Sequence, residues 1–300
     1  MSTTATAVSP SSIAAWKLAV RPKTLPAAVS PVVVGTAVAY HQGGFYWPAA
    51  LACLAVALLL QIASNLANDV LDFRKGADTA KRLGPTRVTQ AGLLSQRQMT
   101  IATVLVLVAS MAVGGFLVWR GGWVFLAVGL LAIVSAVAYT GGPFPLGYNG
   151  LGEVFVFLFF GLVAVVGTAY VQTLTFTTLA VVAAVPVGCL ITAILVVNNL
   201  RDIDTDREAG KRTLAARFGR RFAIYEYDTL LFVSYVIPGL LFTAGAIGNF
   251  FWLPILTVPI ALTLTRKVAV LSGPPLNPVL GDTARLSVIF AVAFAGAIIL

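Results

Sequence analysis

Apolar runs of about 20 residues recur along the whole chain and limit the folds open to it. Hydrophobic residues make up 59% of the 300 positions, and charged residues only 10%. Helices of this length match the hydrocarbon core of a bilayer, whereas a soluble core of this size needs no such runs. The sequence therefore predicts an all-α, polytopic membrane protein.

Apolar windows between charge and turn signals place the expected helices. We predict nine transmembrane helices, at residues 25–41, 47–70, 98–118, 121–140, 151–171, 177–200, 222–245, 248–265 and 284–300. The first residues have neither a basic n-region nor a continuous apolar core, which argues against a cleaved signal peptide. Residues 1–20 are therefore expected to form a disordered or interfacial tail, and residues 21–300 a single transmembrane domain.

Lys and Arg are distributed unevenly about these helices. With nine spans, 19 of the 20 basic residues lie on one side and only Arg120 on the other. The positive-inside rule makes the basic side cytoplasmic, with the amino terminus inside and the carboxyl terminus outside the cell membrane. Topology alone accounts for the net charge of +9, so this charge is no sign of nucleic-acid binding.

Two acidic clusters end apolar helices on the predicted cytoplasmic side. They lie in NLANDVLDFRKGAD and in NNLRDIDTD. On a helix, Asn65 and Asp72 share a face in the first cluster, as do Asn198, Asp202 and Asp206 in the second. Negative charge at the C-terminus of a helix opposes the macrodipole, so a cation is expected there. We expect both clusters to face one central cavity that opens to the cytoplasmic side.

Basic loops follow both clusters, with the sequences KGADTAKRLGPTRVTQAG and REAGKRTLAARFGRR. Carboxylate and amide oxygens suit a hard cation such as Mg²⁺, which shares its remaining positions with substrate phosphates. Lys and Arg would hold the other phosphate oxygens, although topology also explains any single base. The pattern favours ionisation of an allylic diphosphate, whose leaving group metal and bases would stabilise. Its polyprenyl tail would lie in an apolar channel open to lipid.

An uncharged connection, TGGPFPLGYNGLGE, follows the fourth predicted helix. Its Gly and Pro residues predict an irregular backbone, which is tolerated at membrane depth where it lines a cavity. Tyr139 precedes this connection and Glu153 ends it, and both are candidates for the pocket of the acceptor substrate. The alternatives are an interfacial aromatic for Tyr139 and a carboxylate favoured by the helix dipole for Glu153.

Together these motifs resemble the UbiA superfamily of intramembrane prenyltransferases. The residues that carry the resemblance are Asn68-Asp69-x-x-Asp72 and Asn199-x-x-Asp202-x-x-x-Asp206. Three stretches are similar to the 1,4-dihydroxy-2-naphthoate branch of that superfamily: NLANDVLDFRKGADTAKRLGPTRVTQAGLLS, YTGGPFPLGYNGLGE and NNLRDIDTDREAGKRTLAARFG. The position of Asp78, six after Asp72, and the amide at Asn198 differ from the broader superfamily and are similar to that branch.

With the resemblance, the motifs define an expected site. The expected Mg²⁺ ligands are Asn68, Asp69, Asp72, Asp78, Asn199, Asp202 and Asp206. The expected diphosphate ligands are Arg21, Lys75, Arg82, Arg87, Arg201, Lys211 and Arg212. Tyr139 and Glu153 remain the candidate catalytic groups that assist the acceptor.

The resemblance also implies a reaction. A polyprenyl group would pass from an allylic polyprenyl diphosphate to 1,4-dihydroxy-2-naphthoate by electrophilic aromatic substitution with loss of CO₂, giving demethylmenaquinone for menaquinone synthesis. Another aromatic acceptor, such as 4-hydroxybenzoate or homogentisate, is the nearest alternative. A remote alternative is a cation transporter, since related half-sites on membrane helices also fit a repeat. Against transport, both clusters end helices on one side of the membrane, and the adjacent bases would repel a cation.

Overall fold

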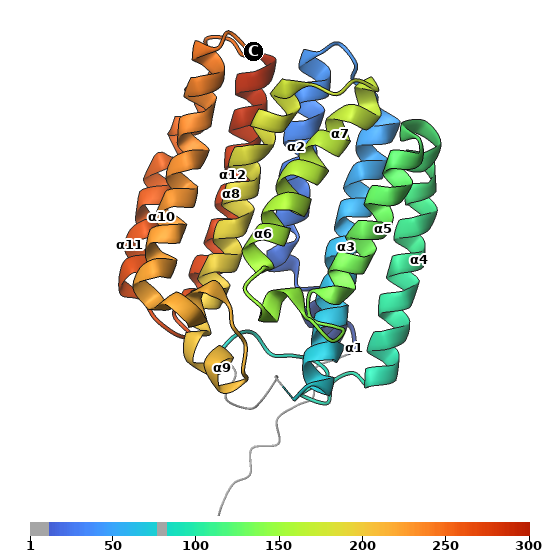
Figure 1. Ribbon diagram of the computed structural model, residues 1–300, viewed down its shortest axis with the longest axis vertical. Coiled ribbons are helices and arrows are strands. Elements are labelled where there is room, and N and C mark those ends of the chain that lie inside the picture. Colours follow the sequence, from blue (N-terminus) through green and yellow to red (C-terminus); the bar gives the residue numbers. More distant parts are fainter. Residues whose placement is uncertain (1–11, 77–82) are drawn as a thin grey trace, which may run out of the picture.

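A computed structural model describes residues 12–76 and 83–300, and every regular element in these ranges is helical. The predicted all-α fold class is therefore confirmed. The helices run side by side between two ends of the molecule (Figure 1). The longer ones are α2 (Pro26–His41), α3 (Trp47–Arg74), α4 (Gln96–Gly121), α5 (Trp123–Ala138), α8 (Thr178–Arg201), α10 (Leu214–Thr243), α11 (Val258–Val270) and α12 (Leu276–Ile299). The shorter elements are α1 (Ser12–Val20), η1 (Pro22–Thr24), η2 (Leu146–Tyr148), α6 (Gly152–Val156), the π-helical η3 (Phe157–Val163), α7 (Ala164–Thr173), α9 (Ile203–Glu208) and η4 (Leu253–Thr257).

Each predicted span coincides with a helical segment, but fewer segments can cross a membrane by themselves. Within the described ranges, six are long and apolar enough: α3, α4, Gly152–Thr173, α8, Leu253–Val270 and α12. A seventh results if Ser12–Thr24 and α2, which meet at a bend of 46°, count as one span. Helix α5 has only 16 residues, and Glu226 and Asp228 interrupt the apolar sequence of α10. The chain is thus a multi-pass membrane protein, and nine crossings stay a prediction.

The last helix begins earlier than the sequence predicts. It starts at Leu276 instead of residue 284, directly after Pro274 and Pro275. Proline is favoured at the start of a helix because it lacks the N–H that this position leaves unbonded. Asp282 therefore lies inside α12, where it contacts Arg285 at 3.1 Å on the same helix.

The first described residues form a helix where the sequence predicts a disordered or interfacial tail. Ala15 and Ala19 of α1 are buried against α3. Asn65 of α3 fixes the end of α1, because its Nδ2 donates to the carbonyl of Val20 and to Oγ1 of Thr24, both at 2.9 Å. The described part of this tail, Ser12–Val20, is therefore helical, and the domain boundary at residue 21 stays a prediction. A helix of nine residues is marginal alone, and burial of its apolar side chains against its neighbours stabilises it.

Helix α8 is the centre of the bundle. In its most apolar 18 residues 78% are buried, compared with 11% for α4 on the outside. It contacts α2, α10, α12 and η3. Gly161 of η3 and Gly188 of α8 allow two backbones to approach closely, since a Cβ at Gly161 would lie 2.8 Å from Cα of Gly188. The acidic residues at the end of α8 are therefore carried by the most firmly packed helix.

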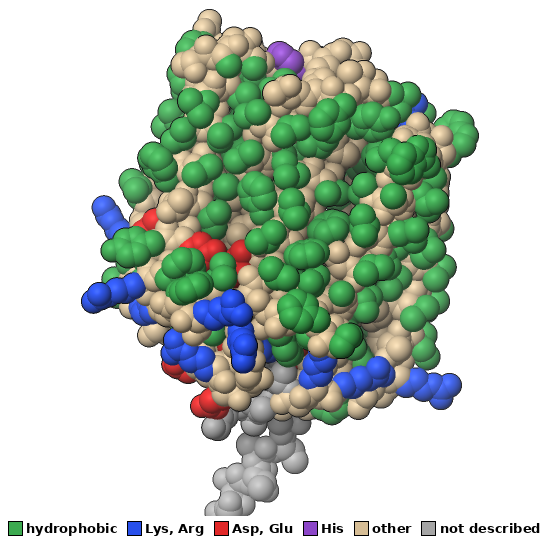
Figure 2. All heavy atoms as spheres, viewed as in Figure 1, with side chains coloured by type: hydrophobic (Ala, Val, Ile, Leu, Met, Phe, Trp, Pro, Cys, Tyr) green, Lys and Arg blue, Asp and Glu red, His purple; other side chains and the backbone are tan. Residues whose placement is uncertain are grey.

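Basic side chains gather at one end of the bundle, which also holds α1, α9 and the connection 139–151 (Figures 1 and 2). We call this the polar end. Arg120 lies at the opposite end, where it stabilises the C-terminus of α7. Its Nε and Nη2 donate to the carbonyls of Val171 and Gln172 at 2.7 and 3.0 Å, and its guanidinium lies 4.0 Å from the centre of the Tyr46 ring. This packing role explains why one basic residue lies on the side of the predicted topology opposite to the other 19.

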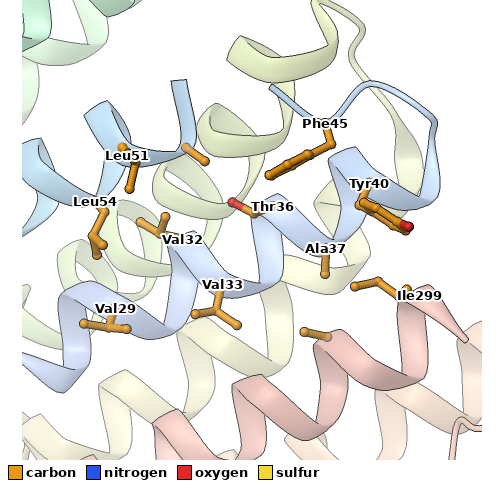
Figure 3. A pocket seen from close by; sticks show the side chains of 12 residues that line it. Val29, Val32, Val33, Thr36, Ala37, Tyr40, Phe45, Leu51, Leu54 and Ile299 are labelled. Atoms are coloured by element: carbon orange, nitrogen blue, oxygen red, sulfur yellow. The ribbon is translucent and has the colours of Figure 1, made fainter. Parts of the chain in front are cut away.

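An apolar pocket lies far from the polar end. It has a volume of about 420 Å³ and lies between α2, α3 and α12 (Figure 3). Val29, Tyr40, Leu51 and Ile299 are among its lining residues, and the last three are 41–56% exposed. The pocket therefore opens on the outer face of the bundle, and its apolar lining suits contact with a lipid chain. It contains none of the predicted site residues.

Candidate active site

The two acidic clusters meet at the polar end through one tyrosine and one lysine. The hydroxyl of Tyr148, in η2, donates to Oδ1 of Asp72 on α3 at 2.6 Å. Nζ of Lys211 lies 4.7 Å from the centre of the Tyr148 ring and 3.5 Å from Oδ1 of Asp206 on α9. Asp72 and Asp206 thus border the same small group of side chains, although the chain separates them widely.

Asp72 is almost completely buried and is held from two sides. Its Oδ2 accepts a hydrogen bond from Nη2 of Arg87 at 2.8 Å, while Tyr148 occupies Oδ1. Arg87 itself is only 6% exposed. A buried carboxylate needs such partners because an unpaired charge is costly away from water. The structure therefore brings Arg87, a predicted diphosphate ligand, directly against a predicted metal ligand.

Asp69, a predicted Mg²⁺ ligand, holds the loop that carries Arg87. Its two carboxylate oxygens accept hydrogen bonds from the backbone N–H groups of Val88 at 3.1 Å and Thr89 at 3.0 Å. Nη2 of Arg21 approaches the same carboxylate at 3.9 Å. Asp69 therefore anchors this loop, and its binding of Mg²⁺ stays a prediction. Helical periodicity places Asp69 beside Asp72, but it cannot reveal that a loop covers this part of the face.

Asn68 and Lys75 border the connection 139–151. Oδ1 of Asn68 accepts a hydrogen bond from Oγ1 of Thr140 at 2.7 Å. Nζ of Lys75 donates to the carbonyl of Thr140 at 2.6 Å and lies 5.1 Å from the centre of the Tyr148 ring. The end of α3 thus fixes both the start and the middle of this connection.

Arg201 organises the second cluster from inside the protein. Its Nε and Nη2 donate to the two carboxylate oxygens of Asp202 at 2.8 and 2.5 Å. Nη2 also donates to Oδ1 of Asn198, and Nη1 to Oδ1 of Asn277, both at 2.8 Å. The residue is only 3% exposed. These bonds engage all three guanidinium nitrogens, so Arg201 orients Asp202, and its contact with a diphosphate stays a prediction.

Asp206 differs from its neighbours in its electrostatic environment. Burial raises the pKa of its carboxyl from 3.8 to about 6, although Lys211 beside it acts in the opposite direction. Asp204, which the helical spacing directs away from the cluster, has a side chain that is 91% exposed. The two acids of α9 therefore face in different directions, and only Asp206 joins the site.

Tyr148 is the site residue that the sequence analysis missed. The ammonium groups of Lys75 and Lys211 both contact its ring, and its hydroxyl donates to Asp72. The backbone carbonyl of Tyr148 also accepts a hydrogen bond from the N–H of Arg212 at 2.7 Å. The only signal in the sequence is an aromatic residue among the Gly and Pro of an uncharged connection. A lone tyrosine in such a loop does not reveal which charges will surround it.

The predicted catalytic candidates lie together on the inner side of the connection. Oε1 of Glu153 accepts a hydrogen bond from Nδ2 of Asn199 at 2.8 Å, and Glu153 is only 6% exposed. The hydroxyl of Tyr139 packs against Gly152, where a Cβ would lie 2.9 Å from it, and Tyr139 is within electrostatic range of Glu153. Asn199 thus supports Glu153 through its amide nitrogen, and its binding of Mg²⁺ stays a prediction.

The remaining predicted ligands are placed less centrally. Arg21 adopts the left-handed conformation, with φ of 54°, at the entry to η1. Arg212 is exposed beside Tyr148. Asp78 and Arg82 lie outside the described residues.

The donor chemistry of the polar end fits a hard cation. Asp72, Asp202 and Asp206 supply carboxylate oxygens, and each is now balanced by an Arg or Lys. Within residues 12–76 and 83–300, no group of three or more acidic, His or Cys side chains is close enough to hold a metal by itself. Shared ligation with a diphosphate is the arrangement that Mg²⁺ adopts with few protein carboxylates.

Comparison with known proteins gives this site its context. The chain is 41% identical over 293 residues to the 1,4-dihydroxy-2-naphthoate octaprenyltransferase of Mycobacterium leprae, covering 96% of this chain and 97% of that protein. It is 40% identical to the Escherichia coli protein of the same name, with 90% of each chain covered.

Solved structures share the fold. A UbiA homolog from Aeropyrum pernix K1 superposes with a TM-score of 0.71 at 16% identity, covering 92% of this chain and 98% of that one. A UbiA homolog from Archaeoglobus fulgidus bound to DMAPP and Mg²⁺ superposes with a TM-score of 0.64 at 16% identity, covering 95% and 98%. The model of the UbiA prenyltransferase family matches residues 28–275. This chain therefore belongs to the UbiA prenyltransferase family.

Proposed function

We propose that this protein transfers a polyprenyl group from an allylic polyprenyl diphosphate to 1,4-dihydroxy-2-naphthoate, with loss of CO₂, to give demethylmenaquinol, the reduced form of demethylmenaquinone. The observation that carries the proposal is the meeting of Asp72 and Asp206 around Tyr148 and Lys211. Such a group of carboxylates and bases suits a metal diphosphate. The acceptor is supported by the names of the relatives at 40–41% identity.

The carboxylates of Asp72, Asp202 and Asp206 would hold Mg²⁺, and Asn68 and Asp78 complete the proposed set. The cation would neutralise negative charge that develops on the leaving diphosphate. Lys75, Lys211 and Arg87 already lie against the carboxylates or Tyr148, so their donors are positioned for the phosphate oxygens. Arg21, Arg82 and Arg212 are the outer candidates for the same diphosphate.

The acceptor pocket is proposed on the inner side of the connection 139–151. Glu153 has one oxygen fixed by Asn199, and its Oε2 has no hydrogen-bond partner within the described residues. This oxygen would take the proton of the acceptor hydroxyl next to the attacked ring carbon. The new C–C bond forms as the allylic C–O bond breaks, and the proton returns to the ring oxygen when the carboxylate leaves as CO₂. Tyr139 would orient the ring.

The proposed topology has nine crossings, an amino terminus in the cytoplasm and a cavity that opens at the polar end. It is supported by the basic side chains at that end (Figure 2) and by the packing role of the one exception, Arg120. The protein would lie in the cell membrane.

The test of the proposed function is turnover in lipid or detergent with a polyprenyl diphosphate, 1,4-dihydroxy-2-naphthoate and either Mg²⁺ or a chelator. Mg²⁺-dependent demethylmenaquinol is the expected product. Diphosphate release that occurs with 4-hydroxybenzoate or homogentisate but not with 1,4-dihydroxy-2-naphthoate would show that the acceptor is a different aromatic compound. If the folded protein forms no prenylated product but carries Mg²⁺ into proteoliposomes, it is a cation transporter and not a prenyltransferase.

A further inference from the structure

A second acid lies near Glu153 and comes from a different helix. Glu226 is on α10, which packs against α8 as α6 does, and it lies within electrostatic range of Glu153 on α6. It lies seven residues beyond the break at Gly219, where φ is 82°, and so roughly 10 Å further along the helix. Figure 2 shows acidic side chains within the hydrophobic belt, above the basic end. Neither Glu226 nor Asp228, two residues further along, belongs to the two acidic clusters of the polar end.

Neither acid of this pair has a basic partner. Among the described residues, the ion pairs within 4.0 Å include neither Glu153 nor Glu226. Glu153 is more than nine-tenths buried, and its Oε2 accepts no hydrogen bond from any of the described residues. An acid at membrane depth is costly to insert, so it is a functional candidate by default. Two acids without basic partners suit a ligand that brings its own O–H donors.

The acceptor of the proposed function has two such donors, one at each side of the ring. The hydroxyl beside the carboxylate carries the reaction, while the second lies across the same ring. We propose that Glu153 binds the first hydroxyl and that Glu226 accepts a hydrogen bond from the second, which makes Glu226 a residue that determines acceptor specificity. The inference rests on the proposed function. The carboxylate of the acceptor would point toward the bases of the polar end, since both acids repel it.

The arrangement predicts discrimination between two acceptors. 1-Hydroxy-2-naphthoate retains the reacting hydroxyl and the carboxylate but lacks the second hydroxyl. A site that binds a hydroxyl through a buried polar group disfavours the analogue without it, because that group is left unpaired. The quantity to measure is the ratio of kcat/KM for 1,4-dihydroxy-2-naphthoate to kcat/KM for 1-hydroxy-2-naphthoate. Each variant is compared with the wild-type ratio, which cancels the different intrinsic reactivities of the two rings.

Three variants in lipid nanodiscs test Glu226. Glu226→Leu should lower the ratio roughly 10- to 100-fold, the range expected for a hydrogen bond to a charged group. Glu226→Gln keeps an acceptor oxygen and should lie between Glu226→Leu and the wild type. Asp228→Leu is the matched control on the same helix, because two residues at about 100° each turn Asp228 to a different side of α10 from Glu226. Its ratio should stay within threefold of the wild type.

The outcomes separate the two proposals. An unchanged ratio in Glu226→Leu, or an equal fall in Asp228→Leu, would overturn the role of Glu226 while the proposed function stands. If Glu226→Leu loses activity with both acceptors and no longer binds the prenyl diphosphate, Glu226 is required for folding. In that case a wild-type ratio in Glu226→Gln would refute the inference. A wild type that does not prenylate 1,4-dihydroxy-2-naphthoate at all would remove the proposed function itself.

Discussion

Tyr148 offers the most direct test of how the two acidic clusters are joined. Tyr148→Phe removes the 2.6 Å hydrogen bond to Asp72 but leaves the ring against Lys75 and Lys211. A hydrogen bond to a charged group contributes about 1.5–3 kcal/mol, which corresponds to a fall of roughly 10- to 100-fold in kcat/KM for the prenyl diphosphate. Tyr148→Leu also removes the ring. Two ammonium–ring contacts at about 0.5–1 kcal/mol each add roughly another tenfold loss.

The assay is steady-state formation of prenylated product in lipid, at saturating Mg²⁺ and acceptor and with varied prenyl diphosphate. Tyr225→Phe is the matched control, because Tyr225 is 70% exposed on the outer face of α10 and should keep wild-type rates. A Tyr148→Phe variant within twofold of the wild type would refute the role of the hydroxyl. Equal losses in Tyr148→Phe and Tyr148→Leu would refute the role of the ring.

The other predictions concern the partners of the acids. Asp69→Ala should lower the unfolding temperature in detergent, because the N–H groups of Val88 and Thr89 lose a charged acceptor; a wild-type temperature would contradict the anchoring role. Asp202→Ala should destabilise the fold by about 3–5 kcal/mol, because it leaves Arg201 buried without its anion. Asp202→Asn keeps one acceptor oxygen, so it should unfold at a higher temperature than Asp202→Ala and still be inactive. In Mg²⁺-free buffer the unfolding temperature should fall as pH rises from about 4 through 6. Burial raises the pKa of Asp206 to about 6, so the folded protein disfavours the ionised carboxylate. This pH dependence should be absent in Asp206→Asn.

The sequence by itself determined the class of the protein and the chemistry of its polar end. Apolar runs of bilayer length leave helices as the only way to satisfy the backbone in lipid, so the all-α membrane fold followed from composition and spacing. The acids at the ends of α3 and α8 were equally visible, because charge is rare in such runs. Helical periodicity also separated Asp206 from the exposed Asp204.

Only the tertiary structure decided which partner each polar side chain has. Asp69 and Asp72 are neighbours on one helical face, yet a loop binds the first and Tyr148 the second. Arg201 looks like any cytoplasmic base in the sequence, but the packing around α8 turns it inward to Asp202. Glu226 and Glu153 come close because α10 and α6 both pack against α8. Periodicity describes one helix at a time, whereas these contacts depend on how several helices and loops pack together, and no local pattern encodes that arrangement.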